Sequence, residues 1–215
     1  YIPIGDDPHA VAMATGVNTR QGSRRLLEYA FEHAIATGRK KITVVHKANI
    51  MKALTGLFLE TALQLHEQKY KDRIALETMI VDACAMQLVL NPWQFDVLLA
   101  TNLFGDILSD EMAGLVGGLG LAPGGNIGAD TAIFEAVHGS APDIAGKGIA
   151  NPTATILSAA MLLRYSLGLD EEALAVEAAV EAALAAGART ADIAAAPGEA
   201  ISTSAFTDRV LAGLA

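Results

Sequence analysis

Apolar positions follow a helical period near the start of the chain. Between residues 20 and 37 they fall three or four apart, at Leu26, Leu27, Ala30, Phe31, Ala34 and Ile35. This spacing places them on one face of a helix, and Gly38 is a natural helix end. The pattern therefore predicts an amphipathic helix over residues 20–37.

Strand-like and helical patterns alternate through the middle of the chain. Strands are predicted at Ile42–Val45, 74–81, Phe95–Ala100 and Ala132–Val137, and helices at 52–68, 83–90 and 106–116. The alternation favours an α/β architecture. Residues 117–128 are too rich in glycine to continue a helix, so we interpret them as a turn and crossover region and a candidate domain boundary. After the loop 138–152, alanine- and leucine-rich helices are expected, with Pro152 opening the first.

Composition narrows the function classes. The chain has 215 residues, is 52% apolar and carries a net charge of −9. This excludes a wholly disordered chain and gives no reason to expect nucleic acid or an anionic membrane as partner. Cys84 is the one cysteine and cannot form a disulfide within the chain, so a cytoplasmic location is predicted. We interpret Cys84 as a small buried residue. No apolar run is long enough for a transmembrane helix. Because the chain opens on Tyr1, it is expected to be a piece of a longer protein.

Acidic residues form the most informative pattern. Asp106 and Asp110 lie four residues apart in a predicted helix, where their charges repel unless a cation or open water separates them. Asp82 ends the predicted strand ETMIVD. Positions beyond strand ends gather around the crevice of an α/β sheet, and three carboxylates there suit Mg²⁺ or Mn²⁺. The alternative is that Asp106 is a favourable first-turn acid and Asp110 a solvated one.

Other candidates also follow predicted strands. Lys47 and Asn49 come after the strand at 42–45, where a partly desolvated lysine can act as a general base or simply extend into water. His138 opens a loop, as a ligand contact or a structural residue. Asp143 in that loop could accept hydrogen bonds from a ribose or cap a turn. No GxGxxG turn follows the strand at 95–100, and Gly146-Lys147 does not belong to a P-loop.

Taken together, four motifs resemble one family. They are HKANIMK (46–52), IVDACAMQLV (80–89), NLFGDILSDEMAGLVGGLGLAPGGNIG (102–128) and AIFEAVHGSAPDIAGKGIANPTA (132–154). In order and spacing they resemble the β-decarboxylating dehydrogenases, which include isocitrate, homoisocitrate and 3-isopropylmalate dehydrogenases. The resemblance implies that family's fold of two α/β domains. Residues 1–116 would form the substrate and dimerisation domain, residues 117–215 would form the C-terminal half of a split nucleotide-binding domain, and about the first third would be absent.

The resemblance also implies roles for single residues. Asp106 and Asp110 would ligate Mg²⁺ or Mn²⁺, and the partner subunit's Asp82 would complete the site. Lys47 would be the catalytic lysine, delivered across the dimer interface, and Tyr1 the catalytic tyrosine, from its separation from Lys47. The cofactor-binding set would be Asn49 near the nicotinamide together with His138, Gly139, Ser140, Ala141, Pro142, Asp143, Ile144 and Asn151 around the adenosine. Asp143-Ile144 resembles the NAD-preferring loop, because a carboxylate accepts from a ribose 2′-hydroxyl and repels a 2′-phosphate.

From this resemblance the expected function is NAD- and metal-dependent oxidative decarboxylation of a 2-hydroxy acid. Isocitrate, oxidised to 2-oxoglutarate as in the tricarboxylic acid cycle, is the first candidate substrate, ahead of homoisocitrate and 3-isopropylmalate. A homodimer or higher homo-oligomer would share the active site between its subunits. A non-catalytic regulatory subunit is the alternative from another class. The isolated 215-residue chain is expected to be aggregation-prone or inactive.

Overall fold

The computed structural model describes residues 1–214, and the chain divides into two compact units, Tyr1–Leu108 and Ser109–Ala215. Helix α4 (Asn102–Val116) runs from the first unit into the second. The domain boundary expected between residues 116 and 117 stays a prediction, because contacts within the chain define compact units but not the domains of a longer protein.

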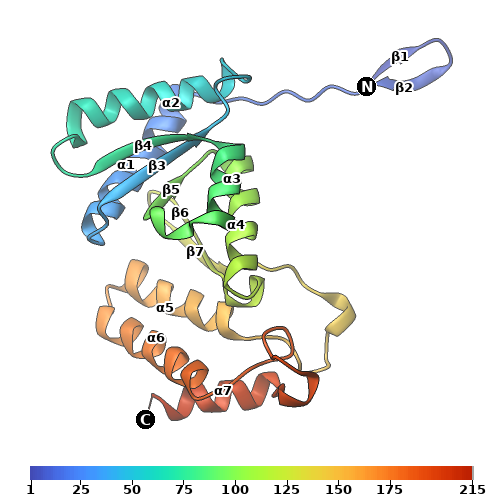
Figure 1. The fold of residues 1–215 in the computed structure, drawn as a ribbon, viewed down its shortest axis with the longest axis vertical. Helices are drawn as coiled ribbons and strands as arrows, with labels where there is room; N and C mark the ends of the chain where they lie inside the picture. Colours follow the sequence, from blue (N-terminus) through green and yellow to red (C-terminus); the bar gives the residue numbers. More distant parts are fainter. Residues whose placement is uncertain (215) are drawn as a thin grey trace. The chain divides into compact units, whose positions relative to one another are not determined.

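The first unit alternates strands and helices, as the sequence pattern indicates (Figure 1). Its elements are β1 (Ile2–Ile4), β2 (Asp7–Val11), α1 (Arg20–Ala36), β3 (Lys41–His46), α2 (Leu54–Leu65), the π-helical turn η1 (His66–Tyr70), β4 (Ala75–Ile80), α3 (Val81–Leu90), the 3-10 turn η2 (Pro92–Gln94), β5 (Val97–Leu99) and the first part of α4. The predicted helix at 20–37 and the predicted strand at 42–45 are therefore both confirmed.

A parallel sheet with the order β4-β3-β5 organises this unit. In β3 and β4, Lys41 pairs with Ala75 at one end and His46 with Ile80 at the other. In β5, Val97 lies opposite Ile42. Because the strands are parallel, the residues that follow β3 and β4 emerge side by side at one end of the sheet.

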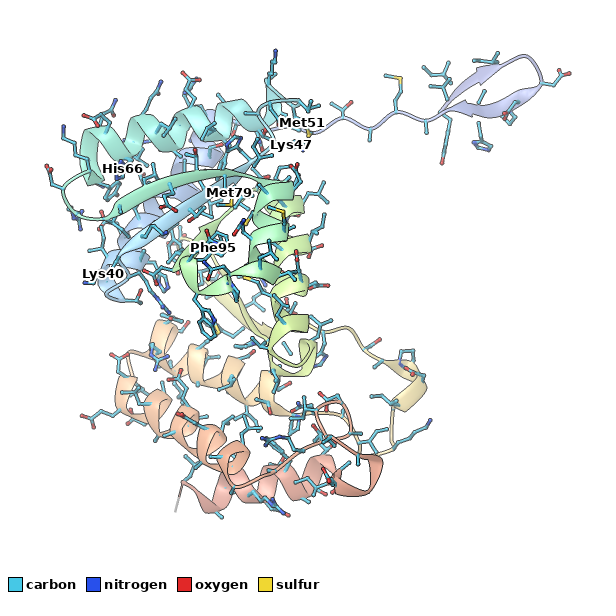
Figure 2. All side chains as sticks on the ribbon, viewed as in Figure 1. Lys40, Lys47, Met51, His66, Met79 and Phe95 are labelled. Carbon is cyan, nitrogen blue, oxygen red and sulfur yellow. The ribbon has the colours of Figure 1, made fainter. Side chains whose placement is uncertain are left out.

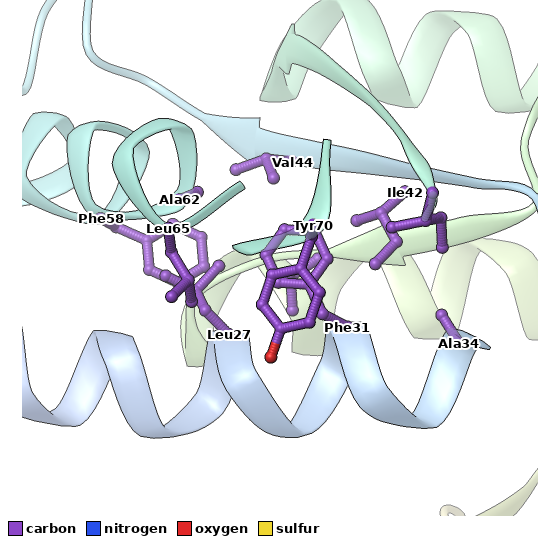
Figure 3. Packing of buried hydrophobic residues seen from close by; sticks show 11 residues of the cluster. Leu27, Phe31, Ala34, Ile42, Val44, Phe58, Ala62, Leu65 and Tyr70 are labelled. Atoms are coloured by element: carbon purple, nitrogen blue, oxygen red, sulfur yellow. The ribbon is translucent and has the colours of Figure 1, made fainter. Parts of the chain in front are cut away.

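The core of the first unit lies between α1, α2 and one face of this sheet. Leu27 and Phe31 of α1 are fully buried, as are Ile42 and Val44 of β3. The Phe31 ring stacks on Tyr70 with 4.5 Å between centroids, and Figure 3 shows the tyrosine between α1 and the sheet. These contacts fix the strands whose ends carry the candidate residues.

Helices dominate the second unit. It contains the rest of α4, the 3-10 turn η3 (Leu119–Leu121), β6 (Pro123–Ile127), β7 (Ala132–Ala136), the 3-10 turn η4 (Pro142–Ile144), α5 (Thr153–Leu167), α6 (Asp170–Ala185), the 3-10 turn η5 (Pro197–Glu199) and α7 (Thr203–Ala212). Strands β6 and β7 form an antiparallel pair against α5. Small residues let α6 and α7 pack closely, with Ala179, Ala183 and Phe206 buried between them.

Several element bounds differ from the sequence-based expectation. The run 117–128 is not only turn, because its last part forms β6, a glycine-containing strand stabilised by pairing with β7. The hairpin of β1 and β2 was not expected, since its strands are short and each contains a proline. Helix α4 begins at Asn102 rather than residue 106. Cys84 is buried in α3, as predicted. Within residues 1–214, no helix combines the length and apolar character that crossing a membrane requires.

Candidate active site and cofactor cavity

Lys47 and Asp82 meet where β3 and β4 end. Lys47 directly follows β3, and Asp82 lies in the first turn of α3, where the helix dipole favours a carboxylate. Lys47 Nζ donates a hydrogen bond to Asp82 Oδ1 at 2.5 Å. This bond lowers the pKa of the Asp82 carboxyl, and a backbone hydrogen bond lowers it further. The Asp82 side chain is 68% exposed and the Lys47 side chain 26%, so the carboxylate faces solvent in the single chain while the lysine is partly covered.

A short turn holds Lys47 at the end of β3. The Lys47 backbone N–H donates to Thr55 Oγ1 (3.1 Å), and its carbonyl accepts from the N–H of Met51 (2.8 Å). The Ala48 N–H donates to His46 Nδ1 at 3.1 Å, and burial lowers the pKa of His46. A neutral imidazole keeps Nδ1 as an acceptor, so the turn is stable near neutral pH. Figure 2 labels Lys47 and Met51 where the chain leaves the sheet. Asn49 lies exposed in this turn.

Asp106 and Asp110 lie one helical turn apart on α4, and both residues are exposed. Helix α4 has no acid in its first turn, so the interpretation of Asp106 as a first-turn acid is wrong. Their carboxylate oxygens are ligands that Mg²⁺ and Mn²⁺ prefer. Among residues 1–214, however, no three His, Cys, Asp or Glu side chains come together closely enough to hold a metal ion. The expected contribution of a partner subunit's Asp82 to a three-carboxylate site stays a prediction.

Tyr1 lies outside the pair of Lys47 and Asp82. It begins the hairpin of β1 and β2, and its ring packs edge-to-face on His9 at 4.6 Å between centroids. The residue is 78% exposed, so most of its surface is open to solvent in the single chain. Its catalytic role stays a prediction.

The second unit contains a cavity of ≈ 550 Å³. Most of the predicted adenosine-binding residues line it, namely His138, Gly139, Ser140, Ala141, Ile144 and Asn151. Pro142 and Asp143 belong instead to the turn η4, and they do not line the cavity. Ala141 opens this turn with a left-handed φ of 41°, which directs the loop around the cavity. The loop 138–151 is thus one wall of a preformed pocket.

Residues that sequence reasoning missed form the rest of the cavity wall. Leu119 and Gly120 come from η3, and Ala191 and Asp192 come from the segment after α6. Leu119 and Gly120 lie within the motif at 102–128, but no cofactor contact was expected for them, and none of the four motifs includes Ala191 or Asp192. Only the folded chain brings these segments beside the loop. The cavity combines mostly apolar walls with a few polar groups, and both this character and its volume are usual for a small-molecule site.

Comparisons with known proteins identify the family of this chain. The isocitrate/isopropylmalate dehydrogenase family matches residues 3–210. The isocitrate/homoisocitrate dehydrogenase of Thermus thermophilus is 53% identical over 204 residues, which cover 95% of this chain and 59% of that protein. A mitochondrial regulatory subunit of NAD isocitrate dehydrogenase from Dictyostelium discoideum is 49% identical over 214 residues, covering 98% of this chain and 58% of that protein.

A solved structure of isocitrate dehydrogenase from Methylococcus capsulatus matches with a TM-score of 0.92 and 46% identity. The match covers all of this chain and 62% of that one. The chain thus spans about three fifths of the length of the relatives it matches. The predicted α/β fold of isocitrate dehydrogenase type is confirmed, and the chain belongs to the isocitrate/isopropylmalate dehydrogenase family.

Proposed function

We propose that the full-length protein catalyses NAD- and divalent-metal-dependent oxidative decarboxylation of a 2-hydroxy acid. The observation that carries this proposal is the contact between Lys47 Nζ and Asp82 Oδ1 at the ends of adjacent parallel strands. It places a candidate proton acceptor beside a candidate metal ligand, which is what oxidation of a metal-chelated hydroxyl requires. The cavity of the second unit adds a binding place for the adenosine of NAD.

Each residue would have a defined task in this reaction. Bound metal would polarise the substrate hydroxyl and adjacent carboxylate, and the nicotinamide would accept the hydride. Lys47 would take the hydroxyl proton at Nζ, and its neighbour Asp82 would stabilise the resulting ammonium. Tyr1 would return a proton to the carbon that loses CO₂.

The proposed assembly is a homodimer, or a higher homo-oligomer, with active sites shared between subunits. Asp106 and Asp110 of one subunit would hold Mg²⁺ or Mn²⁺ together with the partner subunit's Asp82. Exposed apolar side chains on α3 support such an interface: Met86, Val89 and Leu90 are between 53% and 68% exposed. An active site split in this way agrees with the absence of a three-ligand cluster among the described residues of one chain.

Isocitrate is the first candidate substrate, and homoisocitrate and 3-isopropylmalate are the alternatives. Its support is that the relatives from Thermus thermophilus and Dictyostelium discoideum are both named as isocitrate dehydrogenases or their subunits. The name of the Thermus thermophilus relative also includes homoisocitrate, which keeps that acid second. NAD is the preferred cofactor, because Asp143, which lies in the turn η4 next to the cavity-lining Ile144, would repel a 2′-phosphate. The cytoplasmic location stays a prediction, since the Dictyostelium relative is named as mitochondrial.

A non-catalytic regulatory subunit is the second candidate function. The 49% identity with the regulatory subunit from Dictyostelium discoideum favours it. Against it, the chain has an acid or base at every position to which the family resemblance gives a catalytic or metal-binding role. A regulatory subunit has no need for this complete set.

NADH formation by the full-length protein tests the proposal. Purified protein with Mg²⁺ is given isocitrate, homoisocitrate or 3-isopropylmalate, and absorbance of NADH is followed. We expect turnover that is fastest with isocitrate and that disappears with chelator and in Asp106→Asn. A folded, dimeric protein that oxidises none of the three acids would contradict the enzyme proposal and favour the regulatory subunit.

A further inference from the structure

The segment after α6 contacts the predicted cofactor loop at several atoms. Thr203, at the start of α7, donates from its backbone N–H to Gly148 O (2.9 Å) and from Oγ1 to Ala150 O (2.5 Å). Farther along the loop, Asn151 bonds to Asp192, which itself lines the cavity. None of the motifs identified in the sequence includes Asp192 or Thr203. The end of the loop is therefore held by a part of the chain about 40 to 50 residues away.

Asp192 fixes the orientation of the Asn151 side chain. Asn151 Nδ2 donates to Asp192 Oδ2 at 3.0 Å, while Asn151 Oδ1 accepts from the N–H of Thr153 at 3.0 Å. Asp192 Oδ1 accepts from Thr190 Oγ1 at 2.5 Å, and Thr190 is fully buried. Rotating the amide by half a turn would place Asn151 Oδ1 against Asp192 Oδ2, and the Asn151 Nδ2–H against the Thr153 N–H. The network thus selects one amide orientation at the cavity wall.

Gly120 leaves the space that this network needs. A Cβ at Gly120 would lie 2.8 Å from Asn151 Cβ and 2.9 Å from Asp192 Oδ2, closer than real contacts allow. Gly120 also lines the cavity. A side chain here would have to displace either Asn151 or Asp192. The space left at Gly120 and the hydrogen bond to Asp192 therefore both determine where the Asn151 side chain lies.

From these contacts we propose that Asp192 is a positioning residue for NAD. It holds Asn151, and through it the end of loop 138–151, in the binding geometry before the adenosine arrives. Preorganisation of this kind raises affinity because less ordering remains to be done on binding. The inference rests on the proposed function, since it assumes that the cavity takes the adenosine part of NAD. It assigns Asp192 no part in proton or hydride transfer.

Direct binding of NADH to the full-length protein is the primary test. NADH fluorescence is titrated with wild type, Asp192→Ala and Asp192→Asn, and the KM for NAD and kcat are measured separately. For Asp192→Ala we expect the Kd of NADH and the KM for NAD to rise about tenfold, the scale of one lost hydrogen bond to a charged group. We expect kcat to stay within about twofold. Asp192→Asn keeps one acceptor oxygen and should show a smaller rise.

Gly120→Ala provides an independent variant of the same network. It should weaken NADH binding in the way Asp192→Ala does, and the double variant should lose less than the product of the two single losses. Gly198→Ala and Asp208→Ala are the matched controls, because a Cβ at Gly198 meets no atom within 4 Å and Asp208 is exposed on α7. Both controls should bind NADH like wild type. If Asp192→Ala fails to fold, Asp192→Asn and Gly120→Ala answer the same question.

The outcomes separate this inference from the proposed function. Unchanged NADH affinity in folded Asp192→Ala and Gly120→Ala would overturn the role of Asp192 and leave the proposed function intact. A fall in kcat and thermal stability with unchanged NADH affinity would equally overturn it, because it would show a purely structural residue. A wild-type enzyme that binds no NADH but turns over with NADP would overturn the NAD assignment and this inference together.

Discussion

At the end of the parallel sheet, Asp82 faces solvent beside the partly covered Lys47, and the described part of the chain contains no cluster of three possible metal ligands. In the second unit, three separate segments of the same chain enclose a cavity. The first region thus presents chemical groups on an open surface, and the second presents a shaped space with few reactive groups. Under the proposed function, the adenosine of NAD would bind within one chain, whereas the metal site would draw on two chains.

The largest effect is expected at Lys47, at the end of the parallel sheet. Lys47→Met removes the proposed general base, which should lower kcat by about 10³-fold, within the range for a positioned base. NADH affinity should stay unchanged, because the cavity lies in the other unit and none of its residues changes. Steady-state kinetics and NADH titration measure the two effects. Lys40→Met, an exposed lysine beside the same strand, is the control. Equal loss in both variants would contradict the role of Lys47.

The packing of α6 against α7 can be weakened without changing a residue that lines the cavity. Phe206→Ala empties a fully buried position between α6 and α7, which should lower the free energy of unfolding by about 3–4 kcal/mol. Urea denaturation followed by circular dichroism measures this. Leu211→Ala, on the same helix but 57% exposed, should cost less than about 1 kcal/mol. If the two variants lost equal stability, the described packing of α7 would be wrong.

The choice between NAD and NADP should depend on the loop 138–151 of the second unit. Asp143→Lys together with Ile144→Tyr replaces a charge that repels a 2′-phosphate with one that attracts it. We expect the ratio of kcat/KM for NADP to that for NAD to rise about tenfold or more. Asp130→Lys makes the same charge change outside the loop and should leave the ratio unaltered. A ratio unaltered in the double variant as well would show that Asp143 does not meet the ribose.

The smallest effect is expected at Glu32, an exposed carboxyl on α1 of the first unit. Hydrogen bonds from Arg73 and Tyr70 lower the pKa of Glu32 from 4.5 to about 2. A carboxyl whose pKa is lowered by folding stabilises the native state fully above its unfolded pKa, and the contribution is lost as pH falls towards the folded value. Between about pH 4.5 and pH 2, wild type should therefore lose stability that Glu32→Gln never had. Urea unfolding at several pH values measures this, with Glu181→Gln as the exposed control.

The sequence predicted elements that carry their own pattern. The helix α1 and strand β3 follow from apolar periodicity, and the alternation of elements indicated the α/β class. Strand β6 was missed because Gly124 and Gly125 have low strand propensity, and only pairing with β7 makes the strand. The predicted bounds of a helix were wrong where neighbouring polar residues extend it. Helix α4, for example, begins at Asn102 rather than at residue 106.

Candidate site residues were predictable where they belong to long motifs. Lys47 and Asp82 were both named from the sequence, and their contact follows from the pairing of β3 with β4. Asp192 was not predictable, because its role arises from a contact with a residue 41 positions away and no motif surrounds it. Pro142 and Asp143 lie in the turn η4 and do not line the cavity, so their expected part in the cofactor site stays a prediction.

Subunit complementation tests the central inference most directly. Full-length Lys47→Met and Asp106→Asn are each expected to be inactive, since they damage opposite sides of a shared site. When the two are mixed and their subunits exchanged, half of the dimers are hybrids, and each hybrid has one undamaged site. Activity should therefore return to about a quarter of the wild-type value. No return of activity, with hybrid dimers demonstrated by mass spectrometry, would contradict an active site built from two chains.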